Sequence, residues 1–263
     1  MQDEIAPLEQ ELFCTNYELK LLAGQVTGRG LERWIPGFSP LEVEREHFQR
    51  YEFACKHTTN CNVLDIACGT GRGGRLIAEQ GAASSVCGID LEDAAIRYAK
   101  LRNCHPRVIF EVGNGLELTL KDEFDVVICF ETIEHLHSPE VLLANLARGL
   151  KREGMLIIST PVASKPVDLK PANPHHLQEW NCPTFIALLR QNFKVRNMYL
   201  QYHVRPRQPI HRSVLVRLGL AQAPTRPPAT LDPIWKECSF MNPMADFPKA
   251  TWTGYQVYVC SPL

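Results

Sequence analysis

Short apolar runs alternate with helical patterns along the middle of the chain. Apolar runs that predict strands lie at 63–67, 85–90, 108–112, 124–129 and 155–160. Apolar residues at helical spacing predict helices near 73–80, 94–101, 139–150 and 182–192. Five alternations of this kind imply an α/β fold, in which a parallel sheet is covered by helices on both faces.

The pattern changes after Phe193. The stretches FKVRNMYLQYH and GYQVYVC both predict strands with no helix between them, so we expect them to pair antiparallel. Between them, residues 204–250 are rich in proline and too long for a hairpin loop, and such insertions are usually functional or disordered. Scattered apolar side chains favour a cap over a bound substrate rather than an unstructured tether. They are Trp235, Phe240, Met241, Met244 and Phe247.

The chain before the first of these strands has two parts. Residues 1–40 show no regular pattern, and four helix-breaking residues (Gly28, Gly30, Pro36 and Gly37) predict an ordered loop or lid. A helix is expected over about 41–56, with Phe48, Tyr51, Phe53 and Ala54 on its apolar face. The predicted divisions are an N-terminal lid and helix (1–57), a core (58–203), the insertion (204–250) and a final core strand (251–263).

The composition of the chain limits the cellular compartment and the binding partners that we expect. The chain has 263 residues, of which 45% are hydrophobic and 22% charged, so it can bury a substantial core. Lys and Arg number 28 against 29 Asp and Glu, so we do not expect nucleic acid as a partner. The ten cysteines include no C-x-x-C pair, which indicates free thiols in a reducing compartment. With no secretory pattern and no apolar run near the roughly 20 residues that span a bilayer, we expect a soluble, cytoplasmic protein.

A glycine-rich turn follows the first predicted strand, in VLDIACGTGRGG (63–74). Gly69 and Gly71 let the backbone turn tightly and approach a ligand at the start of a helix. The next strand ends in Asp90, about 20 residues beyond the glycines, where a carboxylate accepts hydrogen bonds from ribose hydroxyls. Asp65 lies inside the first strand, where a nicotinamide site needs no acid but a ligand with an ammonium group would use one. The alternative is structural, with glycines that only turn the chain and an Asp90 that caps a helix.

On these residues, the segment from Val63 to Pro161 resembles class I S-adenosylmethionine-dependent methyltransferases, of the subgroup that includes ubiquinone-pathway O-methyltransferases and glycan-modifying relatives. The resemblance covers residues 24–203 and the terminal strand. It implies S-adenosyl-L-methionine as the cofactor and a Rossmann-like seven-stranded sheet of order 3-2-1-4-5-7-6, with the last strand antiparallel. A dinucleotide-binding sheet is all parallel, so the two classes differ in topology.

The resemblance assigns cofactor contacts position by position. Gly69 and Gly71 would admit the methionine portion, Asp65 would hold the amino group and Asp90 would bind the ribose diol. Asn114 stands where the family often has Asp, and its amide oxygen can still accept from the adenine amino group. Further predicted cofactor contacts are Tyr51, Cys68, Thr70, Leu91, which would flank the adenine, Gly115 and Phe130.

Two stretches ahead of the glycine turn, TGRGLERWIPG and EHFQRYEF, also resemble the glycan-modifying relatives. In those proteins an aromatic and a basic residue close over the cofactor. Tyr51, Arg33 and Trp34 are the candidates here, and core packing or a solvated position is the alternative for each.

A second cluster lies in FETIEHL (130–136), at the end of the fourth predicted strand. If a helical turn begins near Glu131, then Glu131, Glu134 and His135 project from one side. Two carboxylates and an imidazole suit Mg²⁺, Mn²⁺ or Fe²⁺ better than a structural zinc site, which would prefer thiolates. The pattern, completed by His176 in NPHHLQEW, resembles the divalent-metal site of small-RNA terminal-ribose methyltransferases and of metal-assisted ubiquinone-pathway enzymes. His175 stands where the RNA enzymes have Asp.

Two alternatives to a metal site remain for this cluster. His135 can act as a general base, and the acidic residues can simply favour the start of a helix. Either a metal or a base would activate a hydroxyl, which is a poor nucleophile when neutral. We therefore expect O-methylation of a small hydroxylated molecule or sugar. The alternatives are a terminal-ribose RNA 2′-O-methyltransferase, which would need a local basic stripe such as HVRPRQPIHR, an inactive cofactor-binding partner subunit, and a nicotinamide-dependent oxidoreductase.

Overall fold

The structure is a computed structural model, and it describes residues 2–27, 33–204, 232–239 and 252–263. Its main sheet runs in the order β3-β2-β1-β4-β5-β10-β8-β9. The strands are β1 (Asn62–Ile66), β2 (Ser85–Asp90), β3 (Val108–Val112), β4 (Phe124–Phe130), β5 (Leu150–Pro161), β8 (Phe193–Val204), β9 (Ile234–Cys238) and β10 (Trp252–Pro262). A second, two-stranded sheet pairs β6 (Val167–Asp168) with β7 (Glu179–Trp180).

The expected topology is confirmed for seven of these strands, and the expected strand number is wrong. Strands β1 to β5 are parallel neighbours, and β10 lies antiparallel between β5 and β8, as the family resemblance implies. The eighth strand, β9, comes from the insertion at 204–250 and pairs antiparallel with β8 at the edge of the sheet. Most of its residues are exposed and only Cys238 is buried, so it gives the weak pattern of an edge strand, which the proline-rich surroundings obscure.

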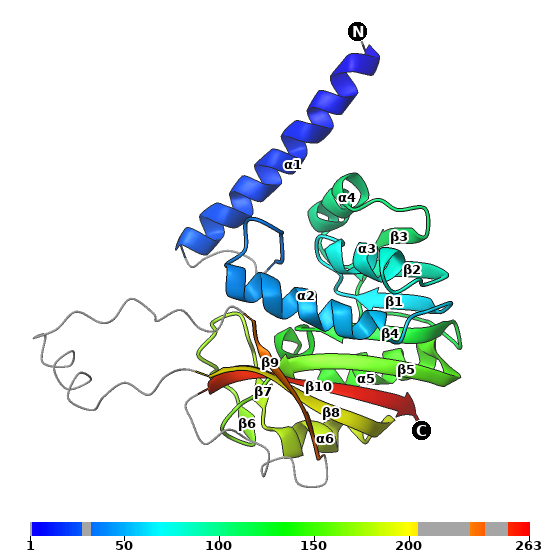
Figure 1. Ribbon diagram of the computed structural model, residues 1–263, viewed down its shortest axis with the longest axis vertical. Helices are drawn as coiled ribbons and strands as arrows, with labels where there is room; N and C mark the ends of the chain where they lie inside the picture. The colour runs from blue at the N-terminus through cyan, green and yellow to red at the C-terminus, as the bar shows by residue number, and fades with distance from the viewer. Residues whose placement is uncertain (1, 28–32, 205–231, 240–251) are drawn as a thin grey trace, which may run out of the picture.

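Helices cover both faces of the sheet. Figure 1 shows α2 (Leu41–Cys55) and α3 (Arg72–Glu79) on the near face, with α5 (Pro139–Gly149) and α6 (Cys182–Leu189) behind it. Successive residues of a strand point to opposite layers: Val63 joins the cluster under α2 and α3, while Leu64 joins the cluster with α5 and α6. Because both layers are buried, the central strands are continuous apolar runs, which is why the sequence identifies them.

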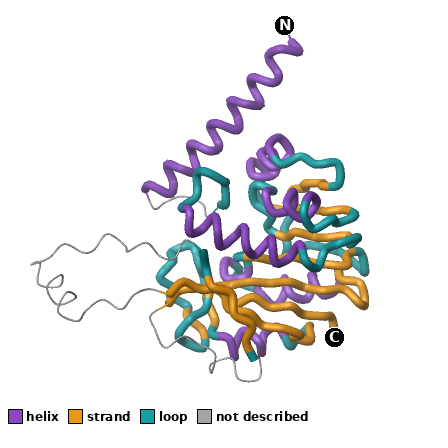
Figure 2. The backbone as a smooth tube through the Cα atoms, in the orientation of Figure 1, coloured by secondary structure: helices purple, strands orange, loops and turns teal. Residues whose placement is uncertain are grey.

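The prediction that residues 1–40 are irregular is wrong. Helix α1 spans Gln2–Thr27 and extends away from the sheet (Figures 1 and 2). It buries Cys14, Tyr17 and Leu21, which follow helical spacing and pack against Tyr98 of α4 (Asp93–Arg102). Gly28 and Gly30 lie outside the described residues, and among the described residues of 1–40 the irregular part is 33–40.

Two further expectations concern the chain as a whole. All ten cysteines are free in the structure, as expected. None of the helices in the described ranges is both long and apolar enough to cross a membrane.

The expected cap at 204–250 lies mostly outside the described residues, apart from the segment 232–239 that carries β9.

Candidate functional site

The glycine turn joins the carboxyl end of β1 to α3. Gly69 and Gly71 both have positive φ angles, of 57° and 78°. A Cβ atom at Gly71 would lie 2.5 Å from the ring of Phe110 and 2.7 Å from the Cβ of Ala99. Only glycine fits this conformation and this space, so the turn can run close to a ligand.

Asp90 is brought to this turn by the parallel pairing of β1 with β2. The carboxylate is 2% exposed, and its Oδ2 accepts a hydrogen bond of 2.8 Å from the amide of Gly69. Its Oδ1 accepts a bond of 2.9 Å from the amide of Glu92. The predicted glycine turn and the predicted ribose-binding acid therefore form one site at the carboxyl edge of the sheet.

Asp65 lies one layer deeper, inside β1. Its carboxyl is 1% exposed, and the Tyr51 hydroxyl donates to both oxygens, at 3.0 and 3.2 Å. Burial raises the pKa of Asp65 to about 7, against the lowering effect of the Tyr51 hydrogen bond; nearby Asp90 raises it further. At neutral pH the Asp65 carboxyl is therefore only partly ionised, and a cation that binds beside it would favour the ionised form.

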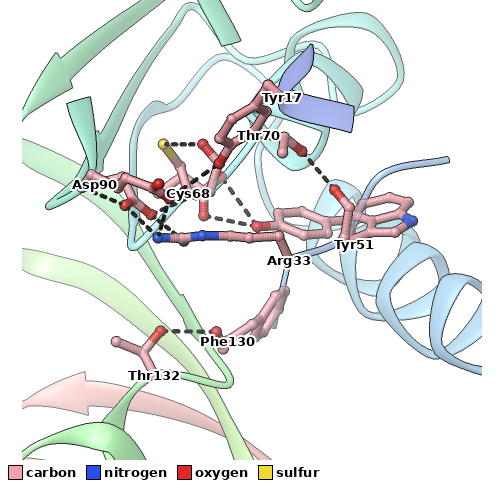
Figure 3. Close-up of polar contacts among 12 residues, drawn as sticks. Tyr17, Arg33, Tyr51, Cys68, Thr70, Asp90, Phe130 and Thr132 are labelled. Atoms are coloured by element: carbon pink, nitrogen blue, oxygen red, sulfur yellow. Dashed lines mark hydrogen bonds and ion pairs between the residues drawn. The ribbon is translucent and has the colours of Figure 1, made fainter. Parts of the chain in front are cut away.

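Residues 33–39 cross this site from the N-terminal side. The guanidinium of Arg33 binds both oxygens of Asp90, with Nη1 to Oδ2 at 2.7 Å and Nη2 to Oδ1 at 2.9 Å (Figure 3). The Trp34 ring stacks on Tyr51, with centroids 5.9 Å apart, and the hydroxyl of Thr70 donates to the Trp34 carbonyl at 2.6 Å. Arg33 and Trp34 thus lie over the glycine turn, as the family resemblance implies.

The other predicted cofactor contacts surround this centre. Phe130 ends β4 and meets Tyr51 edge to face at 5.2 Å, and Cys68 is buried in the turn. Leu91 is 70% exposed just after β2. Asn114 follows β3, and its amide oxygen accepts from the backbone of Leu116 at 3.1 Å. The next residue, Gly115, is anchored through its carbonyl by Asn145 of α5 at 2.9 Å.

The second cluster follows β4, beside the glycine turn in the order of the sheet. Its turn is a short 3-10 helix, Ile133–His135, rather than the start of an α-helix, and Glu131 has a positive φ of 49°. Potential ligand atoms of Glu134, His135 and His176 lie within 4.8 Å of one another. Three of the four predicted metal ligands therefore meet, while Glu131 accepts a bond of 2.6 Å from Ser159 Oγ.

Glu134 is fully buried in this cluster. Its Oε2 accepts from Thr160 at 3.0 Å, whereas its Oε1 has no hydrogen-bond partner among the described residues. Burial raises the pKa of Glu134 well above its ordinary value, and the neighbouring charge of Glu131 adds to the effect. A buried carboxylate oxygen without a donor is the kind of group that a bound cation satisfies.

The two histidines are oriented by their neighbours. The carbonyl of His175 lies 2.9 Å from Nδ1 of His135, so Nδ1 carries the proton and Nε2 keeps the lone pair. Nδ1 of His176 lies 2.6 Å from Glu179, and its Nε2 lies 2.9 Å from the side-chain amide of Asn173. Carboxylate-bound imidazoles of this kind are typical of metal ligands.

Sequence reasoning missed the supports of this cluster. Ser159 and Thr160 end β5 and reach the two glutamates because β5 pairs with β4 in the register Phe130↔Ser159. Nothing local in the sequence marks them. Glu179 could have been predicted from the sequence, because it belongs to the NPHHLQEW stretch that contains His176.

A buried polar group beside the cluster was also missed. Arg50 of α2 is fully buried, and its Nη1 donates to Gln201 of β8 at 2.7 Å. Its guanidinium lies 4.3 Å from the ring centroid of Tyr255 in β10, and Tyr255 donates to Glu46 at 3.1 Å. These residues come from three distant segments, so no spacing in the sequence predicts them.

Comparison with known proteins places this site in a family. The methyltransferase domain family matches residues 57–199, which is more than half of the chain and includes both clusters up to His176. The chain belongs to this family. The expected class, an S-adenosylmethionine-dependent methyltransferase, is confirmed.

Similar curated proteins carry the same class name. A Mycolicibacterium smegmatis protein named as an S-adenosylmethionine-dependent methyltransferase is 34% identical over 180 residues, 65% of this chain and 67% of its own length. A Mycobacterium tuberculosis protein with the same class name is 35% identical over 165 residues, and the chain spans only 58% of its length. The ubiquinone biosynthesis O-methyltransferase of Idiomarina loihiensis is 33% identical over 140 residues, 48% of this chain and 54% of that protein.

Solved structures share the fold at low sequence identity. The cyclase SpnF superposes with a TM-score of 0.59 at 16% identity, covering 96% of this chain and 94% of that one. An S-adenosylmethionine-dependent methyltransferase from Mesorhizobium loti gives a TM-score of 0.53 at 14% identity, covering 84% and 99%. At this identity the likeness extends to the fold alone.

Proposed function

We propose that the protein transfers the methyl group of S-adenosylmethionine to a hydroxyl group of a small hydroxylated molecule or sugar. The observation that carries the proposal is the convergence of Glu134, His135 and His176 beside the glycine turn. A neutral hydroxyl must lose its proton to become a good nucleophile, and this cluster offers the groups for that task. The O-methyltransferase names among the relatives support an oxygen acceptor.

The donor half of the site fits the cofactor. S-adenosylmethionine supplies a methyl group already activated on a sulfonium. Asp65 would bind the ammonium group, Asp90 the ribose hydroxyls, and Leu91 would lie against the adenine. The fit rests on Gly71, which leaves no room for a side chain, and on a buried donor without an acceptor among the described residues, Trp34 Nε1. An anionic ligand group would satisfy such a donor.

The acceptor half fits a hard divalent cation such as Mg²⁺ or Mn²⁺. Glu134 Oε1 lacks a donor among the described residues, and the imidazoles of His135 and His176 lie beside it. A cation held there would supply Lewis acidity that lowers the pKa of an acceptor hydroxyl. For His176 to contribute its Nε2, the side chain of Asn173 would have to give up its present contact.

In the alternative without a metal, His135 removes the hydroxyl proton itself. Its Nδ1 proton is held by the His175 carbonyl, which leaves Nε2 in the form that accepts a proton. The carboxyl of Glu134, whose pKa burial raises, would ionise beside the imidazolium as it forms and so stabilise it. Both schemes use the same residues and the same acceptor class, and they differ in their dependence on a metal.

One experiment tests the acceptor class and separates the two schemes. Methyl transfer is measured with catechols and sugars that carry vicinal hydroxyls, with and without EDTA, and Mn²⁺ binding is followed by electron paramagnetic resonance. For metal assistance we expect EDTA to stop turnover, Mn²⁺ to restore it, and Glu134→Gln to weaken Mn²⁺ binding by roughly tenfold or more. The exposed Glu140→Gln on α5 is the matched control.

The opposite results have definite meanings. Turnover that persists in EDTA but is abolished in His135→Ala assigns the base role to His135 and removes the metal. Methylation of amines with none of hydroxyls would contradict the proposed acceptor class.

A further inference from the structure

Every acceptor position of the Asp90 carboxylate is already used by the protein. Oδ2 accepts from the Gly69 amide at 2.8 Å and from Arg33 Nη1 at 2.7 Å. Oδ1 accepts from the Glu92 amide at 2.9 Å and from Arg33 Nη2 at 2.9 Å. A carboxylate has about four lone-pair positions, so none is left for a ribose hydroxyl.

Only Arg33 can vacate these positions without changing the fold. The Gly69 and Glu92 amides belong to the backbone, in the turn between β1 and α3 and at the start of α4, so they cannot leave without a change of the main chain. Arg33 reaches Asp90 by a side chain, from a segment outside the sheet. Two ribose hydroxyls that replace its two N–H donors would restore the same number of hydrogen bonds to the carboxylate.

Arg33 also fills space against the glycine turn. A Cβ atom placed on Gly69 would lie 3.5 Å from Arg33 Nη1 and 3.7 Å from its Cδ. The Arg33 side chain is 18% exposed and the Asp90 side chain 2%, and Figure 3 shows Arg33 lying alongside Asp90. A ligand that lies across the turn and reaches Asp90 would overlap this side chain.

Neighbouring contacts hold Arg33 in this position and provide an alternative partner. The Ser39 hydroxyl donates to the Arg33 carbonyl at 3.2 Å, and the Thr70 hydroxyl anchors the carbonyl of the adjacent Trp34. Glu92 Oε2 lies 3.5 Å from Arg33 Nη2 and accepts from Tyr17 of α1 at 3.1 Å. A guanidinium released from Asp90 therefore has a second carboxylate within reach.

We propose that Arg33 is an internal occupant of the ribose-binding position, and that the cofactor binds by displacing it from Asp90. The inference rests on the proposed cofactor site, because it assumes that the ribose binds Asp90. The apparent cofactor affinity is then the intrinsic affinity multiplied by the fraction of molecules in which Arg33 has left Asp90. The segment 33–39 and the Tyr17 contact of α1 consequently respond to cofactor binding.

The sign of one mutational effect tests this proposal. Replacing Arg33 by Met removes the competing guanidinium, so we expect S-adenosylhomocysteine to bind roughly tenfold or more tightly than to the wild type, by isothermal titration calorimetry. The same gain is expected for 5′-methylthioadenosine, which has the ribose but neither the carboxylate nor the ammonium group. Arg75→Met, which removes an exposed ion pair with Glu79 on α3, is the control and should not change either affinity.

Two further measurements keep the proposal falsifiable if Arg33→Met folds poorly. Arg33→Lys cannot form the two parallel bonds and should give an intermediate gain. In the wild type, the observed rate of S-adenosylhomocysteine binding in stopped-flow fluorescence should level off at high concentration, at the rate at which Arg33 leaves.

The outcomes separate this proposal from the proposed function. Wild-type binding with unchanged or weaker binding by both Arg33 variants would overturn the displacement model, and weaker binding would make Arg33 a direct cofactor ligand. Absence of binding by the wild type and by both variants would overturn the cofactor site itself.

Discussion

The Tyr51 hydroxyl donates hydrogen bonds to both oxygens of Asp65, which is buried inside β1. This contact links α2 to the strand that leads into the glycine turn. It is too weak to offset burial, which raises the pKa of Asp65 to about 7. The charge of this carboxyl therefore changes within the physiological range, and two predictions depend on it.

The first concerns stability. Between pH 3.8, the ordinary value, and about 7, the folded state binds a proton at Asp65 that the unfolded state has lost. The contribution of Asp65 to the free energy of unfolding should therefore fall as pH rises through this window, by roughly 4 kcal/mol in all. Urea unfolding of the wild type and of Asp65→Asn at several pH values measures it. If the difference between the two proteins does not vary with pH, Asp65 does not titrate in this range.

The second concerns cofactor binding. An ammonium group beside Asp65 requires the ionised carboxylate, so binding releases a proton when the pH lies below about 7. We expect the affinity for S-adenosylhomocysteine to fall by up to about tenfold for each unit of pH below 7. Calorimetry in buffers of different ionisation enthalpy counts the released proton. In Asp65→Asn the affinity should be lower and its dependence on pH weaker; an unaltered pH profile would remove Asp65 from the site.

Two adjacent glycines of α3 make a matched pair for the packing of Tyr51. A Cβ atom on Gly73 would lie 1.9 Å from the Tyr51 ring, whereas one on Gly74 would meet ordinary contacts at 3.5 Å. Gly73→Ala should lower the free energy of unfolding by about 1–3 kcal/mol through overpacking and displace Tyr51 from Asp65. Gly74→Ala should be neutral or stabilising by up to about 1 kcal/mol, because alanine favours the helix. Equal effects in thermal unfolding would contradict this packing.

The sequence predicted the centre of the fold better than its edges. Strands such as β4 are buried on both faces, so their apolar runs are unbroken and can be identified. Helix α1 buries only a narrow stripe that includes Cys14, Tyr17 and Leu21, and it leaves other leucines such as Leu8 exposed. Its periodicity is correspondingly weak. Strand β9 lies at the sheet edge, where a mostly exposed sequence without alternation gives little signal.

The candidate site also has parts that the sequence predicted and parts that it did not. Residues in local motifs, including Gly69, Asp90 and Glu134, were predicted because each motif joins a strand end to a turn. The contact between Arg33 and Asp90 joins residues 57 positions apart, and the support of Glu134 by Thr160 depends on strand pairing. Such contacts are set by the fold, so a single sequence gives their residues but not their partners.

The central claim is that a sulfonium cofactor lies across the glycine turn with its ribose on Asp90. The most direct measurement is calorimetric binding of S-adenosylhomocysteine to Arg33→Met and to Arg33→Met combined with Asp90→Asn. In this background Arg33 no longer competes for Asp90, and the protein groups that still bond its carboxylate are the Gly69 and Glu92 amides. The account predicts binding by the first protein and binding at least about tenfold weaker by the second. Equal affinity in the two, or no binding by either these variants or the wild type, would contradict it.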